Sequence, residues 1–235
     1  AEDGGFAQYK GGKTDVVTTA IGLMAAVELK IADKPMIDRA NAYFSANAKN
    51  FEEVRMAIAG LEAVSTKSDE FPRWLEQIEA LRQPDGAFGE GAGKAFASGG
   101  AGAAILRMGL PLTKKEAVAD AIKTSQRPDG GWSKDDGPAD LSSSYLVMRA
   151  LYMLREKPDL DRLKAFIASC RQADGSYAVR PNARGDLGAT YYAAIMLNWT
   201  RALEEQASLP EPSPYTAIFN GQDLKNWEGN SELWS

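Results

Sequence analysis

Apolar residues recur at helical spacing in several separate stretches of this sequence. In the stretch 141–154, for example, Leu141, Tyr145 and Met148 fall three or four positions apart. This spacing places their side chains on one face of an α-helix. The same pattern predicts helices over residues 15–27, 36–46, 51–64, 74–81, 95–108, 113–127, 140–154, 160–170 and 186–206.

A short Gly-containing motif lies between the two helices of most pairs. Its clearest copy, Gln126–Trp132, reads QRPDGGW. Asp-Gly and Gly-Gly steps mark turns, because glycine adopts positive φ without a steric cost. Related copies that end in an aromatic residue occur at 83–88, 172–177 and 3–6. We interpret the motif as the hinge of a repeated helix hairpin, with a structural role.

The spacing of the repeat is nearly constant. The hinge residues Asp85, Asp129 and Asp174 lie 44 and 45 residues apart. The residues that open the second helices, Lys94, Asp140 and Asp186, are separated by 46 residues in both cases. A fixed period of this length is typical of stacked supersecondary units.

These units predict an all-α protein of about five helix hairpins packed side by side. One hairpin cannot bury its own apolar face, so its neighbours must cover it, and closure into a ring of inner and outer helices would cover both ends. The unit 36–64 has no Asp-Gly hinge, and the first unit contains only the helix after Asp15. We therefore expect an incomplete ring, or one that residues upstream of Ala1 close.

The helical pattern stops at Leu209. Residues 209–214 read LPEPSP, a composition typical of a linker. Residues 215–235 have strand-like composition and a turn signal at Asn220-Gly221, which predicts a short β-like tail. We expect a helical domain over 1–208, a linker over 209–214, and the start of another domain over 215–235.

Composition narrows the possible functions. The formal net charge is -5 and the chain has no basic run, so nucleic acid is not an expected partner. No apolar stretch approaches the roughly 20 residues that a membrane-spanning helix needs. The chain contains no histidine, which removes the commonest zinc ligand, and its one cysteine, Cys170, falls on an apolar helix face and is expected in the core.

The hinge at this period resembles the repeat of the prenyltransferase and terpene-cyclase family. The resemblance rests on Gln126–Trp132, which is close to the family's consensus, and covers about residues 3–206. It implies an α/α toroid, in which the first helix of each pair lies outside and the second lines a central cavity. Because members use the cavity in different ways, the resemblance predicts the fold and leaves the activity open.

The zinc site of the family's protein prenyltransferases is incomplete in this sequence. Tyr177, Arg180 and Asp186 match the family's aromatic residue, diphosphate-contacting Arg and zinc-binding Asp, but Gly188 replaces the zinc-binding Cys. The third family ligand is a His, which this chain lacks. We expect no zinc or other cofactor, so protein prenylation is disfavoured. Class II terpene cyclisation is disfavoured too, since its Asp-x-Asp-Asp cluster is missing.

A second resemblance concerns the tail. Residues 218–227 read IFNGQDLKNW and are similar to the opening of the 3-keto-disaccharide hydrolase family. This resemblance implies that the natural protein continues past Ser235 into a concanavalin-like jelly roll that acts on sugars. The jelly roll would then be a partner of the toroid, and the protein would be extracytoplasmic.

Candidate ligand-binding residues fall in or beside the first turns of the predicted inner helices. Their hydroxyl groups and aromatic rings suit a sugar or another small polar ligand, and two arginines near a helix N-terminus would attract an anion. Each candidate also has a structural interpretation, in packing or in helix capping. Asp186, like Asp15 and Asp140, is expected to cap a helix. The candidates are Thr18, Thr19, Ser142, Ser143, Tyr145, Arg180, Arg184, Asp186, Thr190 and Tyr191.

Two functions remain open at this point. The first is a non-prenylating toroid module that binds a glycan or another ligand and assists a carbohydrate-active domain. The second is an enzyme, either a zinc-independent transferase that binds a diphosphate through Arg180 and Arg184, or a polysaccharide lyase or hydrolase.

Overall fold

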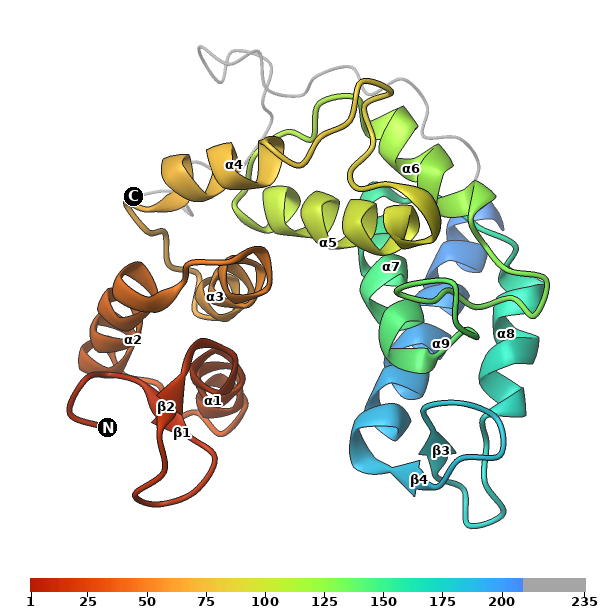
Figure 1. Ribbon diagram of the computed structural model, residues 1–235. Coiled ribbons are helices and arrows are strands. Elements are labelled where there is room, and N and C mark those ends of the chain that lie inside the picture. The colour runs from red at the N-terminus through yellow and green to blue at the C-terminus, as the bar shows by residue number, and fades with distance from the viewer. Residues whose placement is uncertain (209–235) are drawn as a thin grey trace, which may run out of the picture.

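The protein is all-α, as predicted, and forms an α/α toroid of helix hairpins (Figure 1). This computed structural model describes residues 1–208. The inner helices are α1 (Val16–Glu28), α3 (Phe51–Ala63), α5 (Lys94–Arg107), α7 (Leu141–Leu154) and α9 (Leu187–Ser208). The outer helices are α2 (Lys34–Asn47), α4 (Phe71–Glu79), α6 (Lys115–Thr124) and α8 (Leu160–Ser169).

Short secondary elements occur only in the connections of the described chain. The antiparallel hairpins are β1 (Phe6–Ala7) with β2 (Thr14–Asp15), and β3 (Tyr177–Ala178) with β4 (Gly185–Asp186). A 3-10 turn, η1 (Gly91–Gly93), precedes α5. None of the described helices is both long and apolar enough to cross a membrane. The predicted linker 209–214 and the β-like segment 215–235 lie outside the described residues.

The helices follow an arc. Each inner helix packs against the next, from α1 to α3, α5, α7 and α9, and each outer helix packs behind its inner neighbours. Figure 1 shows α1 and α9 at the two ends of this arc, with α2, α4, α6 and α8 around its outside. Within the described residues the toroid is therefore open.

The core lies between the two layers and is built from the predicted apolar stripes. Its largest fully buried side chains include Trp74, Trp132, Phe44 and Phe88. Cys170 is fully buried as predicted, and this burial raises the pKa of its thiol. The side chain thus packs as a small apolar group.

Two hydrogen bonds recur at every hinge. In the first, the Asp carboxylate accepts from the backbone N–H two residues later, in the pairs Asp3–Gly5, Asp85–Ala87, Asp129–Gly131 and Asp174–Ser176. In the second, a hydroxyl in the first turn of the inner helix accepts from the N–H of the hinge aromatic residue, in the pairs Thr19–Phe6, Ser98–Phe88, Ser144–Trp132 and Thr190–Tyr177. The motif is therefore a structural clamp between loop and helix.

The hinge glycines allow each repeat to approach the next outer helix closely. Gly4, Gly86 and Gly130 all have positive φ, and a Cβ atom on them would meet Arg39, Lys114 and Arg162, respectively, at the start of or within α2, α6 and α8. Gly175, in the last hinge, has positive φ but no atom within 4 Å of an added Cβ. Packing against backbone thus excludes a Cβ atom at Gly4 and Gly130, whereas at Gly86 the nearest atom belongs to the Lys114 side chain.

Gln126 and Trp132, the first and last residues of the clearest hinge, also form structural hydrogen bonds. The Gln126 side chain donates to the backbone oxygen of Asp159 at 2.9 Å and accepts from its backbone N–H at 2.9 Å. It therefore joins its own repeat to the N-terminus of α8. The buried Trp132 donates from Nε1 to the Ile122 carbonyl oxygen at 2.9 Å, which fixes the hinge against α6.

Helix α5 is rich in glycine because its neighbours lie very close. A Cβ atom on Gly99 would come within 2.9 Å of the Val147 Cα on α7, and one on Gly100 would come within 3.2 Å of the Phe51 ring on α3. Close packing between inner helices therefore offsets the cost of about 1 kcal/mol for each glycine in a helix.

The start of α6 differs from the cap that its sequence favours. A capping box from Thr113 to Glu116 is the natural reading of the residues before α6. In the structure, Lys114 occupies the cap position in the left-handed region, at a φ of 52°, and no side chain caps the helix. The Lys114 side chain at this turn lies close to Gly86 of the preceding hinge, so the start of α6 lies where two repeats meet.

Removal of the Ser144 hydroxyl tests the clamp. We expect Ser144→Ala to lower the free energy of unfolding by about 1–3 kcal/mol, because the buried N–H of Trp132 loses its acceptor at 2.9 Å. The matched control is Ser142→Ala, since Ser142 is exposed on the same helix. Denaturant unfolding of both variants measures the difference. Equal unfolding midpoints would show that the hydrogen bond between Ser144 and Trp132 does not stabilise the fold.

Candidate functional site

The acidic residues before three inner helices act as caps, as predicted. Asp15 accepts from the Thr18 N–H at 2.7 Å, Asp140 from the Ser143 N–H at 2.8 Å, and Asp186 from the Ala189 N–H at 2.8 Å. The backbone and side-chain hydrogen bonds from Thr18 lower the pKa of Asp15 below its usual value. These carboxylates stabilise the helix N-termini.

Four of the candidate hydroxyls are engaged by this local structure. Thr18 and Ser143 donate to the carboxylates of Asp15 and Asp140, at 2.7 and 2.9 Å. Thr19 and Thr190 belong to the hinge clamps described above. Ser142, by contrast, is exposed. The ligand-binding role of these residues remains a prediction.

The two candidate arginines differ in their surroundings. Arg180 Nη2 lies 3.7 Å from Asp140 Oδ2, so it joins the cap of α7 to the β3–β4 connection. Arg184 is exposed in the same connection. Figure 1 shows the β3–β4 connection and α1 at opposite ends of the arc, and the first turn of α1 contains Thr18 and Thr19. Thr18 and Thr19 thus lie at one end of the arc, and Arg180 and Arg184 at the other.

One accessible stripe runs along α7. Over residues 141–151 every side chain is buried except Ser142, Tyr145 and Arg149. Their spacing of three and four places them on a single helix face. Because α5, α6 and α9 all pack against α7, this stripe is the part of the helix that a ligand can reach.

Aromatic rings extend this stripe onto α9. Tyr145 lies 5.8 Å from Tyr191 and 4.8 Å from Tyr192, measured between ring centroids. It also stacks on Trp199 at 5.3 Å, and Trp199 stacks on Tyr152 at 5.3 Å. We call Tyr145, Tyr152, Tyr191, Tyr192 and Trp199 the aromatic cluster. It brings together the predicted residues Tyr145 and Tyr191.

Tyr191 is the accessible edge of the aromatic cluster. Its residue surface is 50% exposed, and its hydroxyl oxygen lies 3.5 Å from that of Tyr145. Partial burial, together with the hydrogen bond to Tyr145, raises the pKa of Tyr191 to about 12. The phenol consequently stays neutral near pH 7, where it can both donate and accept hydrogen bonds.

Arg149 is a member of the site that the sequence patterns had not singled out. Its Cζ atom lies 4.6 Å from the Trp199 ring centroid, and Nη2 donates to the Tyr145 hydroxyl at 2.9 Å. Burial lowers the pKa of Arg107, at the end of α5, and the nearby charge of Arg149 lowers it further. A usable signal exists in the sequence, because Arg149 is the only charged residue between Leu141 and Leu154.

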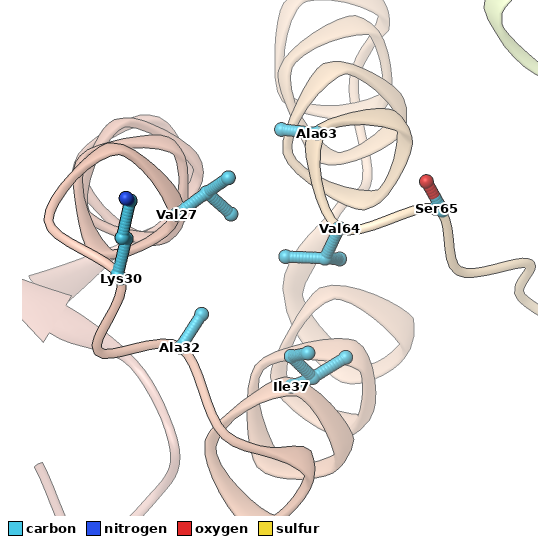
Figure 2. A pocket seen from close by; sticks show the side chains of 7 residues that line it. All are labelled: Val27, Lys30, Ala32, Ile37, Ala63, Val64 and Ser65. Atoms are coloured by element: carbon cyan, nitrogen blue, oxygen red, sulfur yellow. The ribbon is translucent and has the colours of Figure 1, made fainter.

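A separate pocket of about 440 Å³ lies at the C-terminal ends of α1 and α3. Figure 2 shows Val27, Ala63 and Val64 pointing toward one another, with Ile37 below them. Its lining is mainly apolar, and none of the candidate residues contributes to it. The pocket has few of the convergent polar groups that orient a ligand.

The residues in the position of the family's zinc site do not suit zinc. The carboxylate of Asp186 caps α9, Gly188 has no side-chain donor, and histidine is absent from the sequence. Among the side chains that the structure describes, no group of three His, Cys, Asp or Glu residues is arranged to hold a metal ion.

Comparison with known proteins agrees with the helical architecture. Residues 40–227 match the family described as the prenyltransferase alpha-alpha toroid domain. No curated protein matches the chain. The family match covers most of the sequence and includes α3 to α9, with the aromatic cluster. The chain therefore belongs to the prenyltransferase alpha-alpha toroid domain family.

Proposed function

We propose that this protein is a non-prenylating toroid module that binds a glycan at the aromatic cluster. The observation that carries the proposal is the accessible aromatic surface formed by Tyr145 and Tyr191, on two adjacent inner helices. Sugar rings present a flat C–H face that packs on an aromatic ring, with hydroxyls at the edge that need hydrogen-bond partners.

The polar groups around the cluster support a polar ligand over a bare hydrocarbon. The hydroxyls of Tyr145 and Tyr191 lie 3.5 Å apart beside the Arg149 guanidinium, and Ser142 is exposed on the same stripe. A wholly apolar ligand would leave some of these groups without partners, at a cost of about 1–3 kcal/mol for each buried group.

The transferase alternative has less support from the described residues. Its diphosphate would be held by Arg180 and Arg184, but the Arg180 side chain faces the carboxylate of Asp140. An anion at Arg180 would have to compete with this carboxylate. A lyase or hydrolase would use a carboxylate or a tyrosine beside the ligand as acid or base. Asp140, with its 8% exposure, caps α7 instead, and the pKa of Tyr191, raised to about 12, keeps its phenol from acting as a ready base near pH 7.

The proposed partner is a carbohydrate-active domain of the same natural protein. This part of the proposal rests on the resemblance of residues 218–227 to the 3-keto-disaccharide hydrolase family. In this scheme residues 1–208 form the glycan-binding toroid, 209–214 the linker and 215–235 the start of an extracytoplasmic jelly roll. The toroid would hold a glycan close to the domain that processes it.

Substitution of Tyr191 tests glycan binding. An array of neutral and acidic oligosaccharides identifies a ligand of the 235-residue chain, which is then titrated by calorimetry. We expect Tyr191→Ala to weaken its binding about five- to tenfold, because the accessible ring of the cluster is lost.

The matched control is Tyr9→Ala. Tyr9 is 73% exposed in the β1–β2 connection, at the other end of the arc from α9 (Figure 1). Its removal should leave the affinity unchanged. If no oligosaccharide on the array binds, or if both tyrosine variants bind like the wild type, the aromatic cluster is not a glycan site.

A further inference from the structure

Three arginines lie on successive inner helices of the arc. Arg55 is on α3, Arg107 on α5 and Arg149 on α7, which pack in this order (Figure 1). Arg55 and Arg149 both contribute to the electrostatic environment that lowers the pKa of Arg107, after burial, its largest cause. The three guanidinium groups are therefore close enough to interact electrostatically.

Two of these arginines have carboxylate partners. Arg55 donates from Nε to Glu52 at 2.9 Å. Arg107 Nε lies 3.0 Å from Glu62 Oε2, an ion pair without hydrogen-bond geometry, and its side chain is only 10% exposed. Glu52 and Glu62, both on α3, thus largely balance the charges of Arg55 and Arg107.

Arg149 has no carboxylate partner among the described side chains. The Tyr145 hydroxyl is the acceptor that the structure gives it, and its Nε atom is buried without an acceptor. The guanidinium rests on the Trp199 ring, which orients the group without neutralising its charge. A partly buried, unbalanced cation of this kind favours an anion from outside the protein.

Contacts of Arg149 narrow the chemistry of that anion. Nε is buried and Nη2 already donates one hydrogen to the Tyr145 hydroxyl, so the donors left for a ligand are those of Nη1 and the second hydrogen of Nη2. Two parallel N–H donors match the two oxygens of a planar carboxylate. The edge also adjoins Tyr145, so an anion there would lie beside the rings of the cluster.

We propose that the ligand of this surface is an acidic glycan, in which a uronate carboxylate binds Arg149 while the sugar ring packs on Tyr145 and Tyr191. This inference rests on the proposed glycan-binding function and names the class of glycan. The bound carboxylate would also offset the repulsion between Arg149 and Arg107.

Matched acidic and neutral sugars test the inference. Calorimetry would compare tetramers of galacturonate, glucuronate and mannuronate with their carboxyl-reduced forms. We expect at least one acidic tetramer to bind about tenfold or more tightly than its reduced form, because a hydrogen bond to a charged group is worth more than one between neutral groups. About 1 M salt, where the Debye length is about 3 Å, should reduce this preference.

Variants of Arg149 then locate the carboxylate. Arg149→Gln should abolish the preference for the acidic tetramer and leave weak binding of the neutral form. Arg149→Lys should keep part of the preference, because it retains the charge and loses the planar pair of donors. The control is Arg73→Gln on the outer helix α4, where Arg73 pairs with Glu70 and its side chain is 43% exposed. Circular dichroism checks that each variant is folded.

The possible results separate the two proposals. If acidic and reduced tetramers bind equally, or if Arg149→Gln weakens both equally, the acidic class is wrong and the glycan function stands. If neither these tetramers nor any glycan on the array binds, both proposals fall. If inorganic pyrophosphate binds through Arg149 and no uronate does, the anion is a phosphate and the inference is overturned.

Discussion

Replacement of Gly130 by alanine should destabilise the helical domain by about 3 kcal/mol or more. Gly130 has a φ of 96°, a conformation that residues with a Cβ atom rarely adopt. The added Cβ would also clash with the carbonyl oxygen of Arg162 in the first turn of α8. Backbone cannot move aside as a flexible side chain does, so the contact between two repeats would have to open. Thermal or denaturant unfolding of the 235-residue chain measures the loss.

Gly175→Ala is the matched control for this experiment. Gly175 holds the same position in the next hinge, at a φ of 87°, and no atom lies within 4 Å of its added Cβ. This variant should therefore lose only about 1 kcal/mol from backbone strain. Equal losses for the two variants would show that positive φ alone, and not packing between repeats, accounts for the hinge glycine.

Trp132→Ala is expected to cost about 3–5 kcal/mol of unfolding free energy. The Trp132 side chain is fully buried where α6, α7 and the hinge meet, and its loss would leave a large cavity. The variant also removes the hydrogen bond from Nε1 to Ile122. Denaturant unfolding followed by far-UV circular dichroism would measure this change.

Trp132→Phe separates the ring from the hydrogen bond. Phe88 fills the corresponding place in the preceding hinge and is also fully buried, so a phenylalanine ring fits this kind of site. We expect the phenylalanine variant to lose about 1–2 kcal/mol, mainly from the missing N–H and the smaller ring. A loss as large as that of the alanine variant would show that the indole hydrogen bond dominates.

Much of the fold could be predicted from the sequence because its local signals agree with its packing. The hinge Gln126–Trp132 combines a turn, an aromatic core residue and a fixed distance to the next helix cap. The caps at Asp15, Asp140 and Asp186 followed from their positions before apolar helices. Each of these signals is local, and their recurrence every 44–46 residues indicates that the hairpins stack side by side.

The start of α6 shows where this reasoning fails. Thr113 and Glu116 have the right spacing for a capping box, but the chain turns at Lys114 in the left-handed region. That turn lies against Gly86, which belongs to the hinge of another repeat. A local capping preference of about 1 kcal/mol is thus not realised at a position where two repeats meet.

The candidate site was only partly predictable for a similar reason. Tyr145 and Tyr191 were expected in the first turns of inner helices, and the structure brings their rings to 5.8 Å. Thr18 and Thr19 fit the same pattern but belong to the far end of the arc (Figure 1). Arg149 lies in the middle of its helix, where local rules indicate only the buried or accessible face. Its position beside Trp199 depends on how α7 packs on α9.

The open arc has a consequence for how the chain folds and for what a ligand does to it. Packing joins neighbouring repeats, so folding can begin within one repeat and spread along the array, and the end helices open most readily. Within the described residues, helix α9 is an end helix and carries Tyr191, whereas Tyr145 lies one helix further in. A glycan bound across both rings would hold α9 against α7, so that its binding energy would suppress fraying at this end of the array.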